Sequence, residues 1–204
     1  MEQQSRNVTS AGAVPGQAGD AGLLAASARR DASAFAEIVN RYYKPVYRLV
    51  WRMTGGSADS EDIAQEAFVK LWRNPQQVRE AGALKGWLMR VASNAVIDRS
   101  RKPRHGDIDA LPDMADPGAR SDGPLDRSQA ARLIDARIAQ LPERQRLVLS
   151  LVYFEDLSNI EAAEVMEVSV EAVESLLSRA RRSLKGSLAG EWRELLDGLT
   201  APGS

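Results

Sequence analysis

The stretch SNIEAAEVMEVSVEAVESLLSRARRS, residues 158–183, decides the fold of the second half of this 204-residue chain. Ser158 followed by Glu161 has the spacing of a capping box, which predicts the start of a short helix. Ser169 is a typical N-cap residue and predicts a longer helix that ends near Ser183. The intervening turn is three residues long, which is helix-turn-helix spacing.

Two further helices are expected just upstream. Ala130, Ile134, Ile138 and Leu141 recur at helical spacing. Pro142 then occupies a typical first helical position, ahead of a segment whose apolar side chains again repeat every three or four residues.

The first half of the chain has the same periodicity. Apolar and aromatic side chains recur at helical steps from Phe35 to Val50, and Gly55-Gly56 is expected to end that helix.

Two more helices complete this half. Asp59, with Asp62 three residues later, predicts an N-cap in the manner of a capping box, and Asn74-Pro75 predicts the end of that helix. Another helical pattern runs over 84–101 and stops at Pro103. Because no segment alternates with period two over the length of a strand, the predicted fold is all-α.

Charge and aromatic content divide the chain into two units. Overall, 27 Lys and Arg balance 28 Asp and Glu, and this net charge of −1 argues against binding a phosphate backbone. Summed by segment, however, residues 21–102 carry +6, 103–126 carry −4 and 128–190 carry −1, and eight of the eleven aromatic residues lie between 35 and 87. We therefore predict a disordered lead-in over 1–20, a helical domain over 21–102, a flexible acidic linker over 103–127, a second helical domain over 128–190 and a tail over 191–204, with a further short helix over 191–199.

The absence of Cys and the single His limit the chemistry of this chain. Disulfides, thiolate nucleophiles and zinc fingers are excluded. His105 lies in the predicted linker, where a general base has no fixed geometry, and no Gly-rich phosphate loop is present. We therefore expect no catalytic residue, metal, cofactor or small-molecule substrate. Lacking a signal peptide and a long apolar run, the protein is expected to be soluble and cytoplasmic.

Two helix ends concentrate basic side chains. The pattern over 84–101 ends in Asp98-Arg99-Ser100-Arg101-Lys102, and Asn94 lies one turn earlier. The last helix carries Arg179, Arg181, Arg182 and Lys185. Such side chains contact phosphates and base edges, but cations at a C-terminal helix end also complement the helix dipole.

The segment 57–73 has an apolar stripe and an opposite face of acidic and amide side chains, Glu61, Asp62, Gln65 and Glu66. This face is either an ordinary surface with acids near a helix N-terminus or a docking face for a basic partner.

Three stretches resemble, in this order, the conserved regions of the extracytoplasmic-function (ECF) class of bacterial RNA polymerase sigma factors. They are DSEDIAQEAFVKLWRN (59–74), GWLMRVASNAVIDRSRK (86–102) and LPERQRLVLSLVYFEDLSNIEAAEVMEVSVEAVESLLSRARRSLK (141–185). The resemblance covers roughly residues 25–190. It implies two helical domains, sigma-2 and sigma-4, that bind core polymerase and direct it to promoters.

The resemblance also implies roles by position. Docking on the β′ clamp helices of the polymerase falls to Asp62, Gln65, Glu66 and Phe68. Recognition and opening of the minus-ten element falls to Asn94, Asp98, Arg99, Arg101 and Lys102. Contact with the minus-thirty-five element falls to Glu174, Ser175, Leu176, Ser178, Arg179 and Arg182. The implied partners are core RNA polymerase, through the clamp helices and the β flap, promoter DNA and an anti-sigma factor.

Two positions depart from the family's pattern. Glu174 stands where members often have Lys or Arg, and Glu167 stands where the turn often has Gly. Because a Glu accepts from cytosine N4, Glu174 is expected to alter base preference.

An alternative function is that of a sigma-like decoy, which sequesters an anti-sigma protein without binding DNA. We place it second because such decoys are expected to carry a receiver domain and to have lost the basic contacts, whereas the basic cluster from Arg99 to Arg104 is present here.

Overall fold

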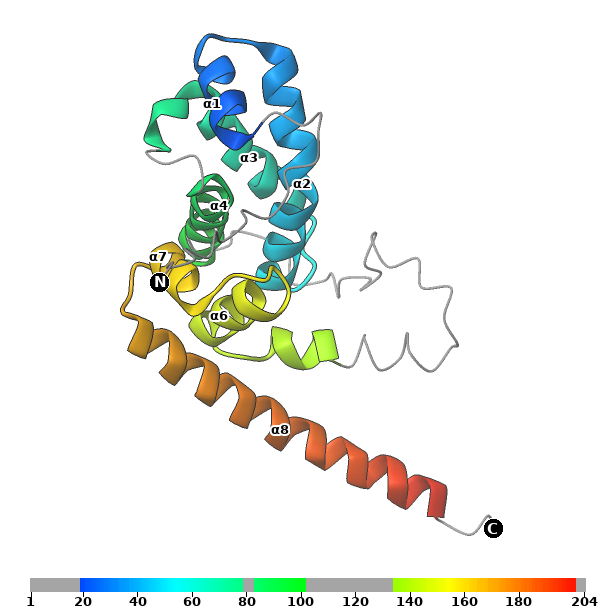
Figure 1. Ribbon diagram of the computed structural model, residues 1–204. Helices are drawn as coiled ribbons and strands as arrows, with labels where there is room; N and C mark the ends of the chain where they lie inside the picture. Colours follow the sequence, from blue (N-terminus) through cyan, green and yellow to red (C-terminus); the bar gives the residue numbers. More distant parts are fainter. Residues whose placement is uncertain (1–18, 79–82, 102–133, 201–204) are drawn as a thin grey trace, which may run out of the picture.

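The computed structural model describes residues 19–78, 83–101 and 134–200, with side chains up to residue 188 (Figure 1). Every regular element in these ranges is a helix, which confirms the prediction of an all-α fold. The predicted linker 103–127 and residues 1–18 of the predicted lead-in lie outside the described residues.

The first helix group, which we call the N-terminal group, extends from α1 to α4. It comprises α1 (Asp20–Ala28), α2 (Ala32–Thr54), α3 (Ser60–Arg73), the short 3₁₀ helix η1 (Pro75–Gln77) and α4 (Leu84–Arg101). α2 ends as predicted, because Gly55 has a φ of 67°, a left-handed conformation that glycine adopts without a Cβ clash. The predicted end of α3 at Asn74 and the predicted bounds of α4 are also confirmed.

The start of α3 differs from the predicted capping box. Asp59 is the N-cap residue, but its side chain makes no cap hydrogen bond. Its φ of −69° and ψ of −7° are already helical, whereas a capping side chain normally projects from an extended backbone. Instead, the Ser60 hydroxyl donates to the main-chain oxygen of Ser57 at 2.6 Å and lies 2.8 Å from the Thr54 hydroxyl.

The helix α1 was not predicted, and its first residue falls in the predicted lead-in. The Asp20 carboxylate accepts hydrogen bonds from Arg41, at 2.6 Å, and from the Tyr42 hydroxyl, so it attaches α1 to α2. Leu23 and Leu24 of α1 are buried in the core. With only nine residues, α1 is too short to display a clear apolar period.

The second helix group, which we call the C-terminal group, comprises a short helix over 134–139, α6 (Glu143–Tyr153), α7 (Asn159–Met166) and α8 (Val170–Thr200). The capping box of α7 is confirmed: the Ser158 hydroxyl accepts from the Glu161 amide at 3.2 Å, and the Glu161 carboxylate accepts from the Ser158 amide at 2.7 Å. Ser169 caps α8 through the Ala172 amide at 3.3 Å. Pro142 precedes α6 as its N-cap residue instead of opening it as its first helical residue.

The helix α8 is longer than predicted. The sequence suggested an end near Ser183 and a separate helix over 191–199, whereas α8 continues without a break to Thr200. A glycine such as Gly186 costs a helix about 1 kcal/mol without ending it. The 31 residues of α8 span about 46 Å at 1.5 Å each, and its C-terminal half extends beyond the rest of the molecule (Figure 1).

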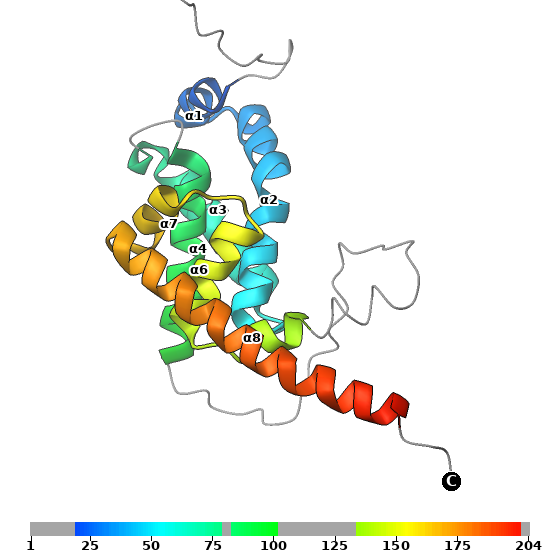
Figure 2. The ribbon, with the colours of Figure 1, turned by 60° about the horizontal axis from the view of Figure 1, so that its bottom comes forward.

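The two helix groups pack directly against each other. α6 contacts α2, α7 contacts α4, and α8 contacts both α6 and α7 and passes across α6 in Figure 2. Buried side chains of both groups form one continuous cluster, from Leu23 in α1 to Leu177 in α8. A smaller cluster, Ile138, Leu141, Leu149 and Ala180, belongs to the C-terminal group alone.

Candidate nucleic-acid interface

The polar face of α3 carries the predicted polymerase contacts. Asp62 and Gln65 are exposed, and the Gln65 amide donates to the Glu61 carboxylate at 3.0 Å. Phe68 is only 5 % exposed, and its ring lies 5.9 Å from that of Tyr43. The structure therefore brings Asp62 and Gln65 to the surface, whereas Phe68 holds α3 against α2.

Glu66 connects the predicted polymerase face to the predicted minus-ten face. Its carboxylate lies 3.2 Å from the Lys70 ammonium and 3.6 Å from the Arg99 guanidinium in α4. The three side chains are between 40 % and 50 % exposed. Because exposed ion pairs contribute only about 0–1 kcal/mol, this link leaves Arg99 available to a stronger anionic partner.

The C-terminal half of α4 carries the predicted minus-ten residues. Asn94, Asp98 and Arg101 are exposed, and Arg99 is half-buried. The apolar side of the helix packs on α2 and α3, which fixes the direction of the polar side. Lys102 lies outside the described residues. Asn, Asp and Arg together offer both donors and acceptors to base edges.

The N-terminal half of α8 carries the predicted minus-thirty-five residues. Those that are exposed are Glu174, Ser175, Ser178, Arg179 and Arg182. Leu176 is half-buried and packs against the core instead. Val173 and Leu177 are buried on the opposite side, so the exposed residues share one face of the helix.

The turn between α7 and α8 contains Glu167 in a left-handed conformation, with φ 53° and ψ 48°. A residue with a Cβ pays about 1 kcal/mol to adopt it, which explains why glycine suits this position. The Glu167 carboxylate lies 3.3 Å from the Arg90 guanidinium of α4, so this turn also contacts the N-terminal group.

No sequence pattern singled out the residues that join the two helix groups. Glu155, in the loop after α6, is 2 % exposed and faces Arg48 and Arg52 of α2. The Lys85 ammonium of α4 donates to the main-chain oxygen of Glu155. In the sequence, Arg48 and Arg52 lie four residues apart on a largely apolar helix. That spacing fits an ordinary solvent-exposed helix face as well as it fits a buried contact.

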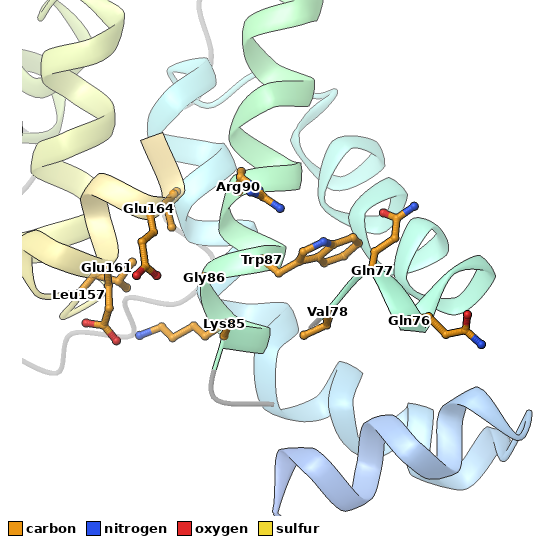
Figure 3. Close-up of a pocket in the computed structure, with 12 residues that line it drawn as sticks. Gln76, Gln77, Val78, Lys85, Gly86, Trp87, Arg90, Leu157, Glu161 and Glu164 are labelled. Atoms are coloured by element: carbon orange, nitrogen blue, oxygen red, sulfur yellow. The ribbon is translucent and has the colours of Figure 1, made fainter. Parts of the chain in front are cut away.

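A cavity of about 1180 Å³ lies between the two helix groups (Figure 3). Lys85, Trp87 and Arg90 line it from α4, and Glu161 and Glu164 line it from α7. In Figure 3 the Lys85 side chain extends across the opening toward the α7 side. The cavity therefore separates cationic and anionic walls that belong to different helix groups.

Among the described residues, no group of three or more His, Cys, Asp or Glu side chains is placed to hold a metal ion. None of the described helices combines the length and apolar character needed to cross a bilayer.

Two family models match the chain. Sigma-70 region 2 matches residues 38–105, and Sigma-70 region 4 matches residues 131–184. A curated relative, the ECF RNA polymerase sigma factor SigW of Bacillus subtilis, is 33% identical over 172 residues, which cover 78% of this chain and 90% of the relative. The chain therefore belongs to the ECF class of RNA polymerase sigma factors.

Solved structures share the fold. The structure of CnrH in complex with the cytosolic domain of CnrY matches with a TM-score of 0.64 at 24% identity, covering 85% of this chain and 99% of that one. The sigma factor RpoE of Bartonella quintana, solved with the anti-sigma factor NepR, matches with a TM-score of 0.62 at 20% identity, covering 76% and 96%.

Proposed function

We propose that this protein is an alternative sigma factor that binds core RNA polymerase and directs it to a particular set of promoters, with no catalytic residue of its own. The observation that carries the proposal is the exposure of three separate polar faces, one each on α3, α4 and α8, at positions that match the family's regions 2 and 4.

Each face has a distinct role in this proposal. Asp62 and Gln65 dock on the basic β′ clamp helices. Asn94, Asp98 and the neighbouring arginines bind the minus-ten element and capture an unstacked base, at a cost of about a few kcal/mol. The N-terminal half of α8 enters the major groove at the minus-thirty-five element, while Arg179 and Arg182 contact phosphates.

The proposal includes an anti-sigma factor. CnrH and the RpoE of Bartonella quintana are both solved as complexes, the latter with a protein described as an anti-sigma factor. By extension, this protein is held inactive by an anti-sigma partner until a signal releases it, and it acts in the cytoplasm together with the polymerase.

Run-off transcription with purified core polymerase and a library of promoter fragments tests the proposal. Adding this protein is expected to yield transcripts from a subset of fragments. Binding to core polymerase without a promoter-dependent transcript from any fragment would contradict it.

One observation favours the alternative function of a decoy. Glu174 places a negative charge on the face of α8 that would read DNA. A decoy binds an anti-sigma protein but neither core polymerase nor promoter DNA. Measuring affinity for core polymerase in parallel with transcription therefore separates the two functions.

A further inference from the structure

The first turns of α8 present one narrow polar face. Its exposed side chains recur at spacings of three, four and seven residues, and they are Glu171, Glu174, Ser175 and Ser178. Residues at these spacings lie on one side of a helix. Val173 and Leu177 are buried on the other side, in the cluster that both groups share. The face therefore offers carboxylate and hydroxyl groups.

The cations of α8 follow further along the helix. They begin only in its third turn, and the exposed ones are Arg179, Arg181, Arg182 and Lys185. In a helix-turn-helix, the N-terminal residues of the second helix reach base edges in the major groove, whereas basic side chains contact phosphates. On α8 this order directs carboxylates and hydroxyls toward bases, and cations toward the backbone.

The direction of the polar face is fixed by the start of α8. The Ser169 hydroxyl accepts from the Ala172 amide at 3.3 Å, and the left-handed backbone of Glu167 sets the turn just before it. Behind the face, Val173 is fully buried. Such a rigid mount suits readout by hydrogen bonds, because these bonds need a defined direction.

The two carboxylates of the face differ in what they bind within the protein. Hydrogen bonds from its own main-chain amide and from the Ser169 hydroxyl lower the pKa of Glu171, so this carboxylate is engaged at the N-terminus of α8. Within the described part of the chain, by contrast, the Glu174 carboxylate makes no hydrogen bond or ion pair. Glu174 is therefore the carboxylate that is available to a base.

A carboxylate discriminates among bases because it only accepts hydrogen bonds. In the major groove, guanine presents two acceptors and thymine presents an acceptor and a methyl group, so neither offers a donor. Adenine presents its N6 amine beside the N7 acceptor, which repels a carboxylate, whereas cytosine presents only the N4 amine. Cytosine is thus the base that a free glutamate fits best.

We propose that Glu174 is a specificity-determining residue of α8 and selects a cytosine in the minus-thirty-five element. The promoters of this protein carry a C·G pair at the position that the second turn of α8 faces, with cytosine on the strand that this turn contacts. A Lys or Arg, which members of the family often have at this position, pairs with guanine instead. This role of Glu174 rests on the proposed function, in which α8 reads DNA.

A series of substitutions at position 174 is the first test. Starting from a promoter that the protein transcribes, each base pair of the minus-thirty-five element is replaced in turn by the other three. The unchanged protein is expected to prefer cytosine at one position by about fivefold or more, the lower end of what a good contact between a side chain and a base provides. At that position Glu174→Gln is expected to prefer adenine, Glu174→Arg guanine and Glu174→Ala no base.

Glu164 provides the matched control for this series. It is exposed on α7, outside the polar face of α8, and Glu164→Gln and Glu164→Arg make the same changes of charge. Both variants are expected to keep the preference for cytosine. An effect of net charge alone is the same at both positions, whereas a contact with a base changes the preference only when position 174 is altered.

Arg182→Ala provides the opposite comparison. Loss of a cation that contacts a phosphate is expected to weaken transcription from all of these promoters by similar factors and to leave the preference for cytosine in place. The two kinds of variant thus distinguish a residue that reads a base from one that binds the backbone.

The outcomes of these tests separate the inference from the proposed function. Promoter-dependent transcription with one and the same base preference in the unchanged protein and in Glu174→Arg would overturn the inference alone. If no promoter fragment yields a transcript, the proposed function fails. Selection of duplexes from a randomised pool by the full chain at low salt then decides the inference. Cytosine enriched at one position, and no longer enriched in Glu174→Ala, supports it, whereas no enrichment overturns it.

Discussion

The two helix groups bury their apolar side chains in different ways. The N-terminal group packs aromatic rings of its own against each other, such as the half-buried Phe35 and Trp72, whose centroids are 4.8 Å apart. The C-terminal group has a small cluster of its own, made of four buried residues. Other buried side chains of α6, including Leu147 and Leu151, belong to the cluster that both groups share. Two units separated by a predicted linker in sequence therefore share a core in the folded protein.

The largest effect is expected from Leu151→Ala. Leu151 is fully buried in the shared cluster, so the cavity is expected to lower the free energy of unfolding by about 2–5 kcal/mol. Urea denaturation followed by circular dichroism measures it. Ile160→Ala, at a position 63% exposed in α7, is expected to change stability by no more than about 0.5 kcal/mol. Equal effects from the two variants would contradict the shared core.

Arg179→Ala tests the proposed DNA-reading face of the C-terminal group. Loss of a contact to DNA is expected to weaken minus-thirty-five recognition by the polymerase complex by about 1–3 kcal/mol. Promoter affinity at several salt concentrations measures it. Arg144→Ala removes an equal charge from an exposed position of α6 and is the control. An unchanged minus-thirty-five preference would remove Arg179 from this face.

Asp62→Ala combined with Gln65→Ala tests the proposed polymerase-docking face of the N-terminal group. Affinity for core polymerase is expected to fall about tenfold, or about 1.4 kcal/mol, with the fold retained because both side chains are exposed. Titration of labelled protein with core polymerase measures the change. Glu164→Ala is the control on the other group, and core affinity that stays constant in the double variant would exclude this docking face.

Glu167→Gly separates strain in the turn from contact across the groups. In an Arg90→Ala background, where the ion pair is already lost, glycine is expected to raise the free energy of unfolding by up to about 1 kcal/mol through relief of the left-handed conformation. In the otherwise unchanged chain, loss of the pair offsets part of that gain. Denaturant titration of both backgrounds provides the comparison, and a destabilised glycine variant in the Arg90→Ala background would rule out the strain.

The smallest effect is expected from pH. Burial raises the pKa of Glu155 above its ordinary value of 4.5, opposed by Arg48, Arg52 and Lys85. The folded protein therefore binds this proton more tightly than the unfolded chain. The contribution of Glu155 to the free energy of unfolding is full below about pH 4.5 and is lost as pH rises through the raised pKa.

Urea denaturation at several pH values, from about pH 7 down to about pH 4, measures this linkage. Glu155→Gln is expected to remove the pH dependence, and a His105→Ala background removes the only histidine. A pH response that persists in Glu155→Gln would assign the titration to another group.

Helix positions were largely predictable because they depend on local signals. Gly55, the capping box at Ser158 and the apolar period of 84–101 act within a few residues, and each has its predicted effect. The cap at Asp59 failed because its backbone is already helical. α1 was not predicted because its nine residues show no clear apolar period. The bonds that hold it, from Asp20 to Arg41 and Tyr42, join residues more than twenty positions apart.

The sequence motifs identify the residues of the three candidate faces, but they do not show which of these side chains are exposed. Phe68 and Leu176 belong to matched motifs, yet the structure packs both against the core. The contact of Glu155 with Arg48 and Arg52 spans more than one hundred positions and crosses the predicted linker. No local period or cap encodes such a contact, because it arises from packing between elements that are distant in sequence.

The shared cluster also has a consequence for the order of synthesis. A ribosome releases α1 to α4 before α6 emerges, so the N-terminal group is able to fold first. The surface that receives Leu147 and Leu151 is then already formed when these residues leave the exit tunnel. The earlier half of the chain thus offers a folded apolar surface on which the later half buries these leucines as it emerges.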